Sequence, residues 1–121
     1  MRDHKKLRAF QMADEMAFLL CQVTSVFPKE ELFGLTSQMR RMAVSVPSNI
    51  VEGCARESGA DYIRFLDIAF GSLRELHYQI NLSRRLGFFG DQDSVLIESK
   101  IIETEKVLNA LIRSLRKNKI G

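Results

Sequence analysis

Apolar residues recur at steps of three and four along almost the whole chain, and this spacing limits the fold more than any other feature. An α-helix makes one turn every 3.6 residues, so the spacing gathers apolar side chains on one helical face. Four segments show it, at about residues 5–27, 35–57, 60–87 and 92–117. No segment alternates with the period of two that is typical of a strand. We therefore predict an all-α chain.

Residues that end or begin helices separate the four segments. A proline disfavours helical geometry in the residue before it, and a serine followed three residues later by an acid is typical of a helix start. Pro47 lies inside the second segment, where its missing N–H predicts a kink or a break. The separators are Phe27-Pro28, Ser58 with Asp61, and Gly87 followed by Asp91 or Asp93 as the cap of the last helix.

A chain of 121 residues has room for one core, so we predict one domain over residues 1–121. Long helices joined by short loops favour an up-and-down antiparallel four-helix bundle, with both termini at the same end. No window is apolar for long enough to span a membrane, and we expect a cytoplasmic protein. In this arrangement Cys21 and Cys54 lie roughly 20 Å apart along the bundle, which predicts two separate thiols.

Cationic residues concentrate at the two ends of the sequence. Residues 1–8 hold four cations and one acid, and residues 113–121 hold four cations and no acid, although the whole chain carries only +3. The antiparallel topology merges these segments into one basic end. Its candidate nucleic-acid-binding residues are Lys5, Lys6, Arg8, Arg113, Arg116, Lys117 and Lys119, with Arg40, Arg41, Arg84 and Arg85 near the opposite end as a second choice. The chain lacks Trp and most Phe residues fall at core or loop positions, so base stacking is not supported.

A polar stripe follows the second helix beside its apolar stripe. A tight turn at residues 58–60 sets the register with the third helix and predicts ion pairs on either side of a contact between small residues. The stripe is either such a structural or subunit contact, or a groove for a ligand. The proposed network is Arg41 with Glu75, Ser45 with Gly71 and Ser72, Glu52 with Arg64, and Asn49 and Arg56 on the same stripe.

Motifs for catalysis and metal binding are missing. A di-iron bundle needs Glu-x-x-His pairs, but Arg74 stands three residues before His77. No HExxH, CxxC, P-loop or GxSxG motif occurs. We expect no enzyme activity, no cofactor and no metal.

Several motifs resemble one known family. They are Phe33-Gly34-Leu35, Arg40-Arg41, Pro47-Ser48-Asn49 with Glu52-Gly53, and Gly71-Ser72 followed by Glu75. Together they resemble the four-helix-bundle family first found in intervening sequences of bacterial 23S ribosomal RNA genes. That family is similar to the accessory variability determinant of diversity-generating retroelements. The resemblance implies a ring-shaped homo-oligomer, commonly a pentamer, and RNA, DNA, a reverse transcriptase or another nucleic-acid enzyme as partners.

Two functions remain after this comparison. The leading one is a non-enzymatic oligomeric adaptor that binds nucleic acid or a nucleic-acid enzyme through basic surfaces. The alternative is a structural or protein-interaction oligomer that binds no nucleic acid. Apolar residues outside the core stripes favour self-association in either case, because one bundle cannot bury a helix on all sides. These residues are Met12, Leu19, Ile63, Phe70 and Leu82.

Overall fold

The computed structural model describes residues 2–29 and 34–120, with the side chains of Lys119 and Ile120 outside the described part. A short 3₁₀ helix, η1 (His4–Lys6), precedes four α-helices: α1 (Arg8–Thr24), α2 (Leu35–Cys54), α3 (Gly59–Arg85) and α4 (Asp91–Ile120). No strand occurs in residues 2–29 or 34–120. The all-α prediction is confirmed.

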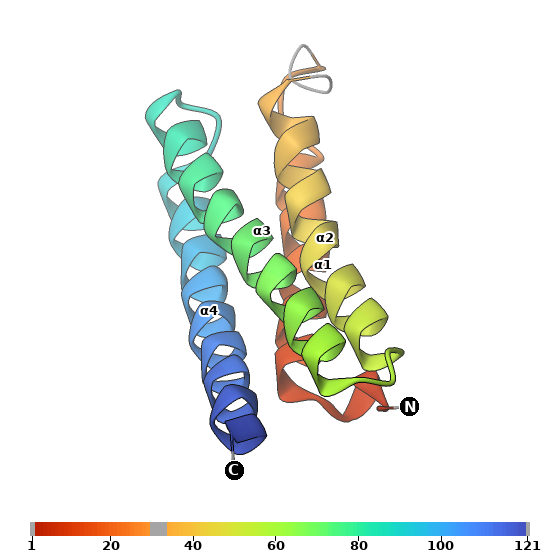
Figure 1. Cartoon of the computed structure of the whole chain (residues 1–121). Helices are drawn as coiled ribbons and strands as arrows, with labels where there is room; N and C mark the ends of the chain where they lie inside the picture. Colours follow the sequence, from red (N-terminus) through yellow and green to blue (C-terminus); the bar gives the residue numbers. More distant parts are fainter. Residues whose placement is uncertain (1, 30–33, 121) are drawn as a thin grey trace.

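The helices alternate in direction and enclose a single core (Figure 1). α2 packs against α1 and α3, and α4 packs against α3 and α1, whereas the described residues show no packing between the diagonal pairs. Both chain termini lie at the same end of the bundle, at the bottom of Figure 1. The predicted up-and-down antiparallel four-helix bundle is therefore confirmed.

Each helix contributes one apolar stripe to the core. Burying a side chain of this size stabilises the fold by about 1.5–3 kcal/mol, and the four stripes together account for the bundle. The largest side chains with less than 2 % of their surface exposed are Met16, Leu20, Met39, Val46, Ile50, Leu66, Leu73, Leu76, Ile80, Ile97, Ile101 and Leu108.

The first two helices are shorter than predicted. Asp3 caps η1 by accepting a hydrogen bond from the backbone N–H of Lys5, and Leu7 is then extended, so α1 begins only at Arg8. α1 ends at Thr24, before the proline, and α2 ends at Cys54 rather than residue 57. Ser58 caps α3 as predicted, because its hydroxyl accepts a hydrogen bond from Asp61 N–H at 3.1 Å.

Pro47 does not break α2. The helix continues through it to Cys54, and the amide of Asn49 donates hydrogen bonds to the carbonyl and the hydroxyl of Ser45 at 2.8 and 3.0 Å. Asp91 and Asp93 lie inside the first turn of α4 and not before it. Acidic residues stabilise that turn because the N-terminus of a helix carries partial positive charge.

The end opposite the termini is closed by aromatic side chains. Gly87 has a φ of +83°, which glycine adopts without strain, and it ends α3 with Phe88 N–H donating to the carbonyl of Ser83. The ring of Phe27 lies 4.8 Å from that of Phe89 and 6.2 Å from that of Phe88. The segment after α1 is thereby packed on the α3–α4 connection. The expected loop residues Glu30, Glu31 and Phe33 lie outside the described residues.

Candidate nucleic-acid interface

Arg2 holds the N-terminal segment against the end of α2. Its backbone N–H donates to the carbonyl of Cys54 at 3.1 Å, and its guanidinium donates to the carbonyl of Arg56 at 2.8 Å. The guanidinium also lies over the ring of Tyr62, 4.1 Å from its centre. Carbonyl groups at a helix C-terminus have no partner within the helix, so Arg2 satisfies them. This contact fixes η1, with Lys5 and Lys6, at the basic end.

Arg56 and Arg64 lie on either side of Phe65 at the same end. Their guanidinium carbons lie 4.9 and 4.6 Å from its ring centre. Arg56 pairs with Glu52 one turn earlier in α2, and Arg64 pairs with Asp61 at 3.6 Å in α3. The predicted pair between Glu52 and Arg64 is therefore wrong, because each side chain takes a partner on its own helix.

An open cavity of about 510 Å³ lies beside these arginines, lined by Arg2, Ala55, Arg56 and Glu57. Two cationic groups and one carboxylate surround it. Such a hollow suits a phosphate group better than a bulky apolar ligand.

Tyr62 and Cys54 lie behind Arg2, out of reach of solvent. Burial raises the pKa of the Cys54 thiol. Burial, and the hydrogen bond between Tyr62 and Cys54, raise the pKa of the Tyr62 hydroxyl to about 12. Both groups keep their protons at neutral pH. Cys54 and Cys21 are free thiols, as predicted.

The predicted cations of the basic end differ in their surroundings. Arg116 of α4 pairs with Asp67 of α3 and so connects two helices. The side chain of Lys119 lies outside the described residues. The remaining five are exposed, and no ion pair involves them within residues 2–29 and 34–118. We call them the five exposed cations: Lys5, Lys6, Arg8, Arg113 and Lys117.

The polar stripe of α2 is a helix–helix contact at its centre. The hydroxyls of Ser45 and Ser72 lie 2.9 Å apart, which confirms the predicted register of α2 and α3. Arg41 and Glu75 are both exposed, and no ion pair joins them. That prediction is wrong because ordering two long exposed side chains costs as much free energy as a surface ion pair returns.

The second-choice arginines also have different roles. Arg40 donates to the hydroxyl of Thr24 at 2.9 Å and to the carbonyl of Cys21 at 3.3 Å, so it caps the C-terminus of α1. Arg84 and Arg85 are exposed in the last turn of α3, where cations are favoured by the helix dipole. Arg40 is therefore unavailable to a ligand, and Arg41, Arg84 and Arg85 remain accessible.

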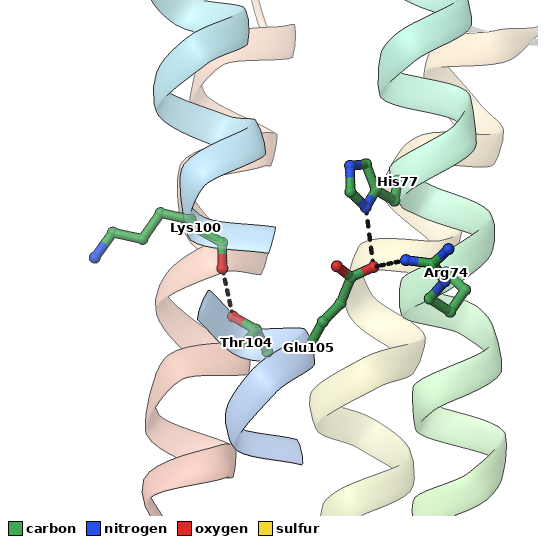
Figure 2. A network of polar contacts seen from close by, with 5 residues as sticks. All are labelled: Arg74, His77, Lys100, Thr104 and Glu105. Atoms are coloured by element: carbon green, nitrogen blue, oxygen red, sulfur yellow. Dashed lines mark hydrogen bonds and ion pairs between the residues drawn. The ribbon is translucent and has the colours of Figure 1, made fainter. Parts of the chain in front are cut away.

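A buried carboxylate was not predicted from the sequence. Glu105 of α4 is 9 % exposed, and one of its oxygens lies 3.0 Å from both Arg74 Nη1 and His77 Nδ1 of α3 (Figure 2). A signal exists in the sequence: Ile101 and Leu108 mark the core stripe, and Glu105 stands between them at helical spacing. A carboxylate at such a position needs a partner on a neighbouring helix.

No group of three His, Cys, Asp or Glu side chains in the described part of the chain could hold a metal ion. None of the described helices is long and apolar enough to cross a membrane.

Residues 5–110 match the sequence family described as 23S rRNA-intervening sequence protein. The chain belongs to this family. Its fold is similar to the crystal structure of a protein of unknown function from the S23 ribosomal protein family of Bacteroides thetaiotaomicron. The similarity covers 87 % of this chain and 95 % of the other, with a TM-score of 0.78 and 24 % identity. None of the curated proteins compared with the chain matches its sequence.

Proposed function

We propose that the chain is a non-enzymatic, cytoplasmic adaptor that binds nucleic acid, or an enzyme acting on nucleic acid, through its basic end. The observation that carries the proposal is the group of five exposed cations, which have no carboxylate partner among the described residues. Phosphate binding needs such cations, because each one that contacts a phosphate releases a condensed counterion. Membership of the 23S rRNA-intervening sequence protein family supports RNA as the first ligand to test.

The five exposed cations come from both ends of the sequence. Lys5 and Lys6 belong to η1, Arg8 begins α1, and Arg113 and Lys117 lie in the last turns of α4. Because α1 packs against α4 and the termini share one end, the cations form one surface (Figure 1). Such a surface positions a phosphate backbone without reading bases. We expect binding that is indifferent to sequence and falls steeply with salt.

The test compares two variants with the same change in net charge. Lys6→Glu with Lys117→Glu reverses two of the five exposed cations, and Lys29→Glu with Lys106→Glu reverses two exposed lysines elsewhere. Anisotropy of a labelled structured RNA is measured at low and physiological salt. We expect the first variant to lose at least tenfold in affinity and its salt dependence to fall by about two contacts.

Equal losses in both variants would show that net charge alone matters, and would contradict a site at the basic end. Undetectable binding by the unmodified protein at low salt would favour the second function, an interaction oligomer without nucleic acid. Arg116 is left unchanged in both variants because its pair with Asp67 contributes to helix packing.

We also propose that the protomers assemble into a closed homo-oligomer, a pentamer by the family resemblance. Glu15 and Lys100 pair at 3.6 Å across α1 and α4. One turn further along each helix, away from the termini, stand Phe18 and Leu96, which are 66 % and 47 % exposed. Apolar side chains this exposed favour a partner surface. They replace the predicted set, of which Ile63 is buried and Leu19 and Phe70 pack on the core.

A further inference from the structure

The outer face of α3 carries a second basic surface, away from the basic end. An open hollow of about 390 Å³ is lined there by Arg74, His77, Tyr78, Asn81 and Arg85. We call these residues the α3 stripe. No part of the proposed adaptor function uses them, except that Arg85 was a second-choice cation.

Helix geometry explains why these residues share a face. At 100° per residue, Arg74, Tyr78, Asn81 and Arg85 fall within an arc of about 60°. All four are exposed, on the side of α3 opposite its buried residues. Arg74 and Arg85 are about 16 Å apart along the helix axis, with the tyrosine and the asparagine between them.

Glu105 fixes one edge of the stripe. A carboxylate only accepts hydrogen bonds, so both Arg74 Nη1 and His77 Nδ1 donate to it (Figure 2). His77 Nε2 is then left as an acceptor, directed away from Glu105 in Figure 2. Arg74 keeps its other donors, and its side chain is 60 % exposed. Both side chains are thus oriented before any ligand arrives.

Tyr78 is the aromatic member of the stripe and is 60 % exposed. An aromatic ring between cations offers a stacking surface for a base while the cations hold phosphates on either side. The amide of Asn81 can both donate to and accept from the edge of a base. The sequence contains no Trp, so this ring is the main exposed candidate for stacking near cations.

We propose that the α3 stripe binds single-stranded nucleic acid, with phosphates on Arg74 and Arg85 and one base stacked on Tyr78. The inference rests on the proposed nucleic-acid binding but assigns it a second surface. An acidic protein segment could pair with the arginines, but it would supply no planar base for the tyrosine. The ring therefore favours a nucleic acid over a peptide.

The experiment uses intrinsic fluorescence, because the chain has two tyrosines and no tryptophan. A base stacked on Tyr78 quenches its emission, whereas Tyr62 is only 4 % exposed. Oligouridylate and oligothymidylate of about ten nucleotides are titrated separately, which spans a typical single-strand site. Binding is followed in parallel by anisotropy of labelled strands.

Three variants identify the ring. Tyr78→Phe should keep the affinity and abolish the quenching, and Tyr78→Ala should lose about tenfold in affinity for single strands but not for a duplex. Phe18→Ala, which removes an exposed ring on another helix, should change neither. Quenching by both oligonucleotides assigns the shared phosphate and base chemistry, and stronger quenching by the RNA adds a contact to the ribose hydroxyl.

Binding without quenching would overturn the inference and leave the basic end as the only site. Quenching that persists in Tyr78→Phe would overturn it as well, because the signal would then come from Tyr62. No binding of any strand or duplex would reject the proposed function together with the inference. Loss of single-strand binding in Tyr78→Ala, with duplex binding intact, separates the two surfaces.

Discussion

At the scale of single residues, the guanidinium groups differ in what they contact. Arg2, Arg40 and Arg116 are committed to carbonyl, hydroxyl or carboxylate groups of the protein itself. Arg40 and Arg41 are neighbours in sequence, yet the first caps α1 and the second is exposed. A count of positive charges in the sequence treats them as equal, because it contains no information on which carbonyl group lies within reach.

Arg40 and Arg41 therefore give a matched test. Arg40→Met should lower the free energy of unfolding by about 1.5–3 kcal/mol, because it removes charge-assisted hydrogen bonds to Thr24 and Cys21. Arg41→Met should change it by less than about 0.5 kcal/mol. Urea unfolding measures both. Equal effects would contradict the capping role of Arg40.

Tyr62 predicts a dependence of stability on alkaline pH. Its pKa is about 12 in the folded chain against the ordinary value of 10, so the folded state holds the proton more tightly than the unfolded state. The stabilisation is complete below pH 10 and is lost as the pH rises towards about 12. Cys54, whose pKa is also raised, adds to the fall. Tyr62→Phe should show a shallower fall in urea unfolding between these pH values, and an unchanged slope would contradict the shift.

At the scale of elements, the closest polar contact between helices is that of Ser45 with Ser72 at the centre of α2 and α3. Small side chains allow two backbones to approach, and a hydroxyl pair then satisfies both polar groups without a charge. The amide of Asn49 joins the same hydroxyl of Ser45. The three side chains act as one small network that fixes the register of the two helices.

A double-mutant cycle tests this network. Ser45→Ala and Ser72→Ala should each cost about 1 kcal/mol, and the two effects should be non-additive by at least about 0.5 kcal/mol. Arg41→Ala and Glu75→Ala, at a level where no ion pair forms, serve as the control and should be additive. Urea unfolding of the six variants gives both coupling energies. Coupling at Arg41 and Glu75 but not at the serines would contradict the observed contacts.

The sequence predicted elements better than it predicted partners. Helical period, Ser58 and the turn that follows it were sufficient for the four helices and for the register of Ser45 with Ser72. Ion pairs were not predictable, because Glu52 and Arg56 can satisfy each other on one helix. The cluster of Glu105 with Arg74 and His77 required knowing how α3 and α4 are rotated, which the spacing of apolar residues fixes only coarsely.

At the scale of the whole molecule, the proposed assembly is tested by its mass. Light scattering at micromolar concentration should give a multiple of the protomer mass of 13.9 kDa, five times for a pentamer. Phe18→Ser with Leu96→Ser should reduce the mass towards one protomer, because polar side chains remove the apolar contact. Val26→Ser, at an exposed residue beyond the end of α1, is the control and should leave the mass unchanged. A wild-type mass of 13.9 kDa would rule out the assembly.

The packing of α1 against α4 has a kinetic consequence. Every other packed pair of α-helices is adjacent in sequence, whereas these two helices join opposite ends of the chain. Closing a longer loop costs more conformational entropy, so pairs of successive helices form earlier than distant ones. We expect the α1–α4 seam, with its pair of Glu15 and Lys100, to form after the folding transition state. Substitutions in the seam then accelerate unfolding and leave the folding rate nearly unchanged.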